Sequence, residues 1–280
     1  MPGNGEQITS RSYMLAVEDT EFLLRDEMRS MRFGMEYAKP ELLLRDWGVR
    51  STVVVFGSAR IPSPEQAEAT VRQAAGPDAV RKAKTRAKLS HWYLEARRFG
   101  RIVSERGGAL STESGPRDNV IATGGGPGIM EAANRGAADA GAPSIGFNIT
   151  LPAEQQPNAY STPALTFRFH YFAMRKMHLA MRANALAVFP GGFGTFDELF
   201  EILTLQQTGK APPMPVILFG RQFWKKAIDF DVLADMGLVE RADLALFDIV
   251  DDAEEAWHAM VRRGLKAHSP AVPLPGAPST

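Results

Sequence analysis

The segment Pro190–Glu198, with the sequence PGGFGTFDE, combines a glycine-rich turn with a carboxylate. It follows an apolar segment, 185–189, and leads into residues 199–203, whose spacing predicts a continuing helix. The glycines let the backbone turn tightly and bring N–H groups close to an anion, and the positive end of the helix dipole adds to that attraction. The turn therefore predicts a phosphate site, and Glu198, one helical turn further on, would face the rest of the same ligand.

A second turn of this kind supports the interpretation. Residues 119–123 predict a strand, residues 124–128 (GGGPG) form the turn, and a helix is expected over 129–140. A single glycine-rich turn could serve only to pack a helix closely on a sheet. Two of them, both at the carboxyl ends of predicted strands, are expected in a doubly wound sheet with a ligand crevice.

Glu198 also has a structural interpretation. The spacing of Thr195 and Glu198 fits a capping box, with Thr195 as the N-cap and Glu198 returning a hydrogen bond from the third helical position. The apolar spacing places Glu198 near the turn and off the buried stripe of the helix, which is predicted to consist of Phe196, Leu199, Phe200 and Leu203. A capping glutamate at this point would lie beside the ligand in either case.

The predicted helix 171–183 supplies cations. Arg175, His178 and Arg182 share one face by their spacing, and the alternatives for that face are solvent or the ligand site. Arg175 is the best candidate to contact a phosphate, ribose or base, whereas His178 fits a surface or packing role better. Lys176 could in principle form a pyridoxal phosphate Schiff base, but no acidic partner for the pyridine nitrogen can be assigned.

Composition narrows the function classes. The chain has 280 residues, of which 45% are hydrophobic, and its 32 Lys+Arg residues balance 32 Asp+Glu residues. A net charge of zero gives no overall field to recruit nucleic acid or a membrane. The chain has no cysteine, which excludes disulfides and thiol nucleophiles, and its five histidines lack metal-ligand spacing. With no secretory signal or membrane span in the sequence, we expect a cytoplasmic protein without a metal or organic cofactor.

Hydrophobic runs that alternate with helical segments predict an α/β fold, a Rossmann-like, doubly wound, mainly parallel sheet with helices on both faces. We expect an N-terminal helical extension over 1–47, a nucleotide-binding domain over 48–266 and a disordered tail over 267–280. The predicted strands are 52–56, 119–123, 144–148, 185–189, 216–219 and 244–250, and 166–170 is expected to be a short extended piece. The predicted helices are 18–38, 41–46 after an interruption at Pro40, 64–107 with a break near Gly76-Pro77, 129–140, 171–183, 195–207, 222–236 and 252–264.

The motifs together resemble the LOG (Lonely Guy) family of phosphoribohydrolases, long mislabelled as lysine decarboxylases. The resemblance rests on GGGPGIM at 124–130, Met174-Arg175-Lys176 and PGGFGTFDE at 190–198, and it extends over about 52–263. The extra N-terminal segment, the long 62–107 region and the motif LPAEQ at 151–155 are similar to the larger bacterial branch of the family.

This resemblance implies an enzyme that cleaves the N-glycosidic bond of a purine nucleoside 5′-monophosphate, of cytokinin type or AMP, to free base and ribose 5-phosphate. It implies a homodimer or a higher assembly of dimers and no nucleic-acid or membrane partner. It assigns Arg175 and Glu198 to the catalytic pair. The substrate-binding residues that it implies are Ser58, Gly125, Gly126, Met174, Lys176, Gly191, Gly192, Gly194 and Thr195.

Two other classes of protein can be weighed from the sequence; one stays open and one is disfavoured. A nucleotide-binding sensor or carrier could use the same fold and turns without turnover. A dinucleotide-dependent dehydrogenase is disfavoured because the first strand ends in Gly57-Ser58-Ala59-Arg60 and lacks the expected G-x-G-x-x-G turn. The basic stretch 72–88 indicates a solvated helix surface without a functional role.

Overall fold

The computed structural model describes residues 3–110, 115–151 and 156–266. Seven parallel strands form one sheet in the order β4-β3-β2-β1-β5-β6-β7. The order runs outward from β1 in both directions, so the chain reverses its winding between β1 and β5. The strands are β1 (Thr52–Phe56), β2 (Val120–Thr123), β3 (Ser144–Ile149), β4 (Thr166–Phe169), β5 (Ala183–Val188), β6 (Val216–Phe219) and β7 (Phe247–Val250). The predicted α/β fold with a mainly parallel sheet and an N-terminal helical region is confirmed, and all seven strands of the described residues are parallel.

Two apolar layers cover the sheet because alternate residues of each strand point to opposite faces. Val53 and Val55 belong to one layer, which includes side chains of α6 (Ser90–Arg106), α7 (Ile129–Asp139) and α12 (Ala253–Arg262). Val54 and Phe56 belong to the other layer, with side chains of α3 (Arg29–Asp46), α8 (Phe172–Met181), α9 (Phe193–Gln207) and α10 (Arg221–Ala227). The core is therefore a three-layer sandwich of helices, sheet and helices.

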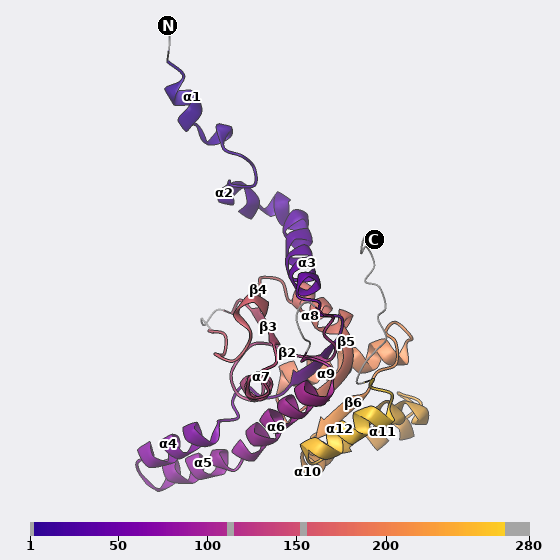
Figure 1. Ribbon diagram of the computed structural model, residues 1–280. Helices are drawn as coiled ribbons and strands as arrows, with labels where there is room; N and C mark the ends of the chain where they lie inside the picture. The colour runs from indigo at the N-terminus through magenta and orange to yellow at the C-terminus, as the bar shows by residue number, and fades with distance from the viewer. Residues whose placement is uncertain (1–2, 111–114, 152–155, 267–280) are drawn as a thin grey trace.

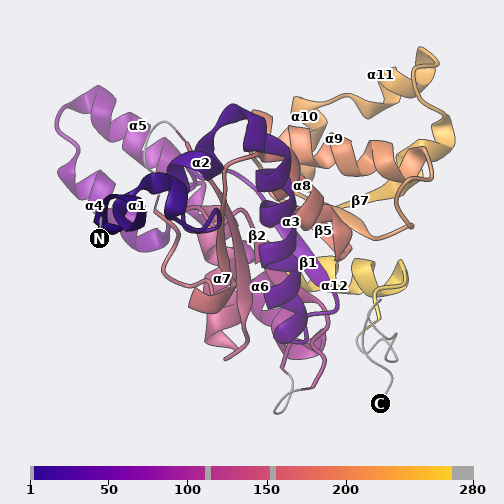
Figure 2. The same ribbon diagram turned by 90° about the horizontal axis from the view of Figure 1, so that it is seen from above.

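Two helical segments project from this body (Figure 1). The N-terminal one carries α1 (Gly5–Thr9), η1 (Arg11–Tyr13), α2 (Thr20–Leu24) and η2 (Asp26–Met28), and it extends beyond the end of α3 (Figures 1 and 2). The other pairs α4 (Pro64–Gln73) with α5 (Pro77–Ala87) and leads back to the sheet through α6. The predicted break at Gly76-Pro77 is confirmed, since Gly76 precedes α5 with a positive φ of 86° and Pro77 opens it.

Several predicted boundaries are wrong. Pro40 does not interrupt the first long helix: it is buried inside the continuous helix α3. The predicted helix 222–236 is two helices, α10 and α11 (Phe230–Asp235), and the predicted strand 244–250 is shortened by a 3-10 helix, η4 (Arg241–Leu246). Another 3-10 helix, η3 (Pro163–Leu165), precedes β4. The predicted tail 267–280 and residues 152–155 of the LPAEQ motif lie outside the described residues.

Helices α6 and α7 approach each other through glycine. A Cβ atom built at Gly136 would lie 2.0 Å from the backbone oxygen of Arg97, and one at Gly100 would lie 2.3 Å from that of Ala133. Backbone atoms on both sides leave no flexible side chain to move away. The glycines of this helix pair therefore allow the backbones of α6 and α7 to come into direct contact.

We expect Gly136→Ala to lower the free energy of unfolding by about 3 kcal/mol or more, the upper end of overpacking effects in cores. Gly34→Ala is the matched control, because its added methyl group meets no atom within 4 Å on α3. It should instead stabilise the helix by about 0.5–1 kcal/mol. Urea unfolding of both variants measures the difference, and equal stabilities would show that α6 and α7 are not closely packed.

Candidate active site

A cleft lies at the carboxyl ends of β1 and β5, where the winding of the sheet reverses. Crevices at such switch points are the usual ligand sites of open parallel sheets. Ser58, which follows β1, ties three turns together: its N–H donates to the carbonyl oxygen of Pro190 (3.0 Å), and its own carbonyl accepts from the N–H of Ile129 (3.2 Å). The cleft has a volume of about 1390 Å³, which is ample for a nucleotide.

The turn after β5 presents an uncapped helix end to this cleft. Gly192 is the N-cap of α9, and no side chain caps it. Among the hydrogen bonds of the described residues, the backbone N–H groups of Gly192, Phe193 and Gly194 have no acceptor. All three residues line the cleft, together with Gly191 and Thr195. Unpaired N–H groups and the positive end of a 15-residue helix make this position attractive to an anion.

Gly191 is required by a close approach within the turn. A Cβ atom there would lie 2.0 Å from Oγ1 of Thr195, whose side chain is buried under the turn. Thr195 itself stands inside the first turn of α9, so the predicted capping box is wrong. The carboxylate of Glu198 bonds to another helix instead.

Arg175 and Glu198 form a buried ion pair in the cleft wall. Arg175 comes from α8 and Glu198 from α9, and Nη1 of Arg175 lies 3.2 Å from Oε1 of Glu198. Nε of Arg175 donates to the carbonyl oxygen of Phe147 (2.8 Å), which fixes the guanidinium. The two residues are only 9% and 5% exposed. Glu198 is therefore on the buried face of α9, not off it as the apolar pattern predicted.

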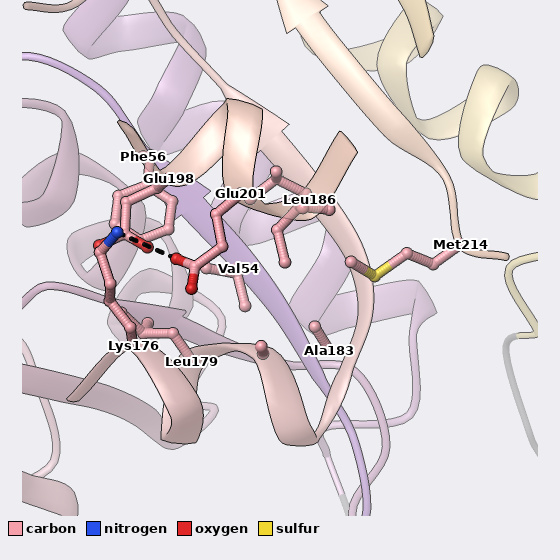
Figure 3. Close-up of a pocket in the computed structure, with 11 residues that line it drawn as sticks. Val54, Phe56, Lys176, Leu179, Ala183, Leu186, Glu198, Glu201 and Met214 are labelled. Carbon is pink, nitrogen blue, oxygen red and sulfur yellow. Dashed lines mark ion pairs between the residues drawn. The ribbon is translucent and has the colours of Figure 1, made fainter. Parts of the chain in front are cut away.

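Burial dominates the titration of this pair. It raises the pKa of Glu198 to about 7, against the opposing effect of the positive charges of Arg175 and Lys176. It also lowers the pKa of Arg175, although Glu198 favours the charged form. Behind Glu198 lies a small pocket, lined mainly by apolar side chains such as Val54, Leu179 and Leu186, which accounts for the poor solvation of the carboxylate (Figure 3). A carboxyl group that titrates near neutral pH can both accept and donate a proton.

Lys176 and Met174 stand away from the cleft. Nζ of Lys176 lies 2.7 Å from Oδ2 of Asp197 and 3.1 Å from Oε2 of Glu201, and Figure 3 shows the second of these contacts beside the apolar pocket. Burial alone would lower the pKa of Lys176, but the hydrogen bonds that its ammonium group donates to the two carboxylates raise it. Met174 is half-buried against the apolar core. Neither residue lines the cleft.

The turn after β2 reaches the cleft through Gly124, which leaves room for Arg175: a Cβ atom there would lie 2.6 Å from Nη2 of that arginine. Gly125 and Gly126 are buried behind it, and Asn158 holds both. The N–H of Asn158 donates to the carbonyl of Gly125 (2.8 Å), and its Nδ2 donates to that of Gly126 (3.1 Å). The N–H of Gly125 donates to Oγ1 of Thr123 (2.9 Å), so it is not free for a ligand.

The rest of the basic face of α8 is buried rather than solvated. His178 is only 2% exposed and packs against the rings of Tyr37, Phe147 and Phe169, and this burial lowers its pKa. Arg182 pairs with Glu41 of α3 at 2.5 Å. These contacts hold α8 in place, and of Arg175, His178 and Arg182 only Arg175 lines the cleft.

The cleft also contains residues that the motifs did not indicate. Four cations line it, Arg60, Arg86, Lys88 and Lys226, although the basic stretch 72–88 predicts only a solvated surface. An apolar end near Arg175 is formed by Met130, Ile149, Leu151 and Phe172. The only sequence signal for the four cations is their charge. Charge alone does not reveal that α5 folds back beside the turn after β1.

Within the described residues, no group of three or more His, Asp or Glu side chains is placed to hold a metal ion. The same part of the chain contains no helix that is both long and apolar enough to cross a membrane.

Residues 130–260 match the sequence model of a protein family described as "Possible lysine decarboxylase". That description is the one long attached to the LOG family, and the match covers the helix after the second glycine turn, Arg175 and the whole of α9. These residues are therefore similar to a lysine decarboxylase-like (LOG-type) domain. No curated protein matches the chain.

Three solved structures are similar to this chain over about three quarters of its length. The X-ray structure of the protein TM1055 has 20% sequence identity and a TM-score of 0.46, covering 76% of this chain and 99% of the other. The molybdenum cofactor binding protein of the phototrophic bacterium Rippkaea orientalis has 18% identity and a TM-score of 0.43, with coverages of 76% and 95%. The Moco carrier protein of Chlamydomonas reinhardtii has 18% identity and a TM-score of 0.46, with coverages of 76% and 97%.

Proposed function

We propose that this protein is a phosphoribohydrolase that releases the base from a purine nucleoside 5′-monophosphate. The observation that carries the proposal is the position of the buried Arg175–Glu198 pair, about one and a half helical turns behind the uncapped start of α9 in a single cleft. The resemblance of the motifs to the LOG family supports the same reaction class.

The geometry suits one orientation of the nucleotide. The 5′-phosphate would bind the free N–H groups at the start of α9, which places the ribose against Glu198. The base would then occupy the apolar end of the cleft formed by Met130, Ile149, Leu151 and Phe172. Phosphate binding at a distance from the reacting bond would thus align the anomeric carbon with the catalytic pair.

The reaction needs a group that stabilises positive charge on the sugar. When the N-glycosidic bond breaks, its electron pair leaves with the base, and positive charge develops on the ribose ring. The carboxylate of Glu198 would stabilise this charge and orient a water molecule toward the anomeric carbon. The water oxygen becomes the new hydroxyl of ribose 5-phosphate, and one of its protons ends on the departing base. Arg175 would hold the carboxylate of Glu198 and the nucleotide in the correct relative position.

The label of the matching family raises lysine decarboxylation by pyridoxal phosphate, and Lys176, the lysine next to Arg175 in the motif, does not fit a Schiff-base role. Schiff-base chemistry needs a neutral amine. Lys176 is held between Asp197 and Glu201, its pKa is raised, and it does not line the cleft. We therefore derive no step through that cofactor.

Incubation with AMP and with isoprenylated AMP, followed by chromatography for free base and ribose 5-phosphate, tests the proposal. Base release that depends on enzyme concentration supports it. Saturable AMP binding without base release from any purine monophosphate would instead identify a nucleotide sensor or carrier. The homodimer that the LOG resemblance implies stays a prediction, and light scattering of the purified chain tests it.

A further inference from the structure

The cleft has a second wall that is strongly cationic. Arg60 follows β1, Arg86 and Lys88 stand at the end of α5, and Lys226 belongs to α10. Among the described residues, none of the four has an acidic partner within ion-pair distance. The acidic residues of the cleft are Asp197 and Glu198, and both are already paired, with Lys176 and Arg175. The uncompensated charge of this cleft is therefore positive.

The cationic wall is anchored beside the glycine turn. The guanidinium of Arg86 donates two hydrogen bonds to the carbonyl oxygen of Arg60 (3.1 and 3.0 Å), which ties the end of α5 to the loop after β1. Trp92, near the start of α6, packs edge-on against Phe189, with ring centroids 6.5 Å apart. Phe189 directly precedes the turn that opens α9, so Lys88 and its neighbours are held near that turn.

Arg86 and Lys88 lie on the opposite side of the sheet edge from the catalytic pair, whereas Lys226, on α10, belongs to the same layer as the pair. Arg175 and Glu198 come from helices of one layer, whereas Trp92 and the segment before it adjoin the other layer. The uncapped start of α9, which follows β5 next to the central strand β1, borders both layers. A nucleotide with its sugar at Glu198 and its first phosphate at α9 directs any further phosphoryl group away from the sugar, toward the cations.

We propose that Arg60, Arg86, Lys88 and Lys226 form a second anion subsite, which makes the cleft prefer nucleoside 5′-diphosphates over monophosphates in binding. The inference rests on the proposed function for the position of the first phosphate. A diphosphate bound in this way occupies the monophosphate site and competes with the nucleoside monophosphate for it. Charge-assisted hydrogen bonds to a phosphoryl group are the stronger class of such contacts, and no cation of the wall has to break an ion pair to form them.

Calorimetric titration of the full chain with AMP and with ADP, without divalent cations and at two salt concentrations, tests this inference. We expect ADP to bind about tenfold more tightly than AMP, and its affinity to fall more steeply with salt. The double variant Lys88→Gln/Lys226→Gln should bring ADP to within about twofold of AMP and leave AMP affinity almost unchanged. Both lysines are exposed and carry no ion pair, so the fold should tolerate the change.

The matched control is Lys84→Gln/Lys225→Gln, which removes the same charge from two exposed lysines that do not line the cleft. It should keep the preference for ADP. Equal affinities of AMP and ADP for the unaltered protein, binding of neither, or the same loss in the control would overturn the inference. The outcome for the subsite is independent of the outcome for the proposed hydrolysis. A preference for ADP without base release from AMP would support the subsite and contradict the hydrolysis. Base release from AMP without a preference for ADP would contradict only the subsite.

Discussion

Replacing Glu198 by Gln should lower the rate of base release from AMP by about 10²–10⁴-fold, the range expected when a positioned proton-transfer or charge-stabilising group is lost. The amide keeps the size of the side chain, and its oxygen can still accept the hydrogen bond from Nη1 of Arg175. What it removes is the negative charge that would face the sugar. Affinity for AMP should stay within about threefold, because the phosphate contacts at the start of α9 are untouched.

Glu201→Gln is the control for this experiment. Glu201 lies one turn further along α9 and pairs with Lys176, and it does not line the cleft. Its loss removes the same charge from the same helix, so it should leave the turnover number within about twofold of the unaltered protein. Steady-state kinetics together with calorimetric AMP binding measure both variants. Full activity of Glu198→Gln, or an equal loss in Glu201→Gln, would remove Glu198 from the chemistry.

Much of the fold follows from local sequence pattern. The apolar runs of β1, β5 and β6 are buried on both faces, and such runs separated by helices predict a parallel sheet. Each glycine-rich turn follows an apolar run in the sequence, which predicts that the turn lies at the carboxyl end of a strand. Pro40 shows where local rules fail: proline usually ends a helix, but α3 continues through it because its C-terminal half packs on the core through Leu44.

The site shows a sharper limit. The local pattern of Thr195 and Glu198 predicts a capping box, yet α9 begins two residues earlier and the carboxylate bonds to Arg175, which is 23 positions away in the sequence. The choice between these partners depends on how α8 packs beside α9, which no local pattern contains. The same holds for Arg86 and Lys88, whose place in the cleft depends on the hydrogen bonds from Arg86 to the loop after β1. The motifs predict Arg175, Glu198 and the glycine turn of the candidate site, but tertiary contacts determine the burial and ionisation of these side chains.

That dependence predicts how the pH profile should respond when Arg175 is changed. In the proposed reaction Glu198 acts as a carboxylate, so kcat/KM should rise with pH through the pKa of about 7 that burial gives this group. The charge of Arg175 lowers that pKa. Arg175→Gln removes the charge, so a higher pH is then needed to ionise Glu198, and the rising limb should move to more alkaline pH. The rate on the plateau should also fall by about 10²-fold, because the guanidinium no longer positions the nucleotide.

Arg175→Lys separates charge from geometry. The ammonium group keeps the positive charge but cannot reproduce the bonds of the guanidinium to both Phe147 and Glu198. We expect the limb to stay nearer its original position while the plateau falls. Arg182→Gln, directly after the same helix, breaks the ion pair with Glu41 outside the cleft, and it should lower stability without moving the limb. If kcat/KM measured from pH 5 to 9 shows the same limb in Arg175→Gln as in the unaltered protein, Glu198 is not the group whose ionisation sets the rate, and the buried pair serves the fold rather than the reaction.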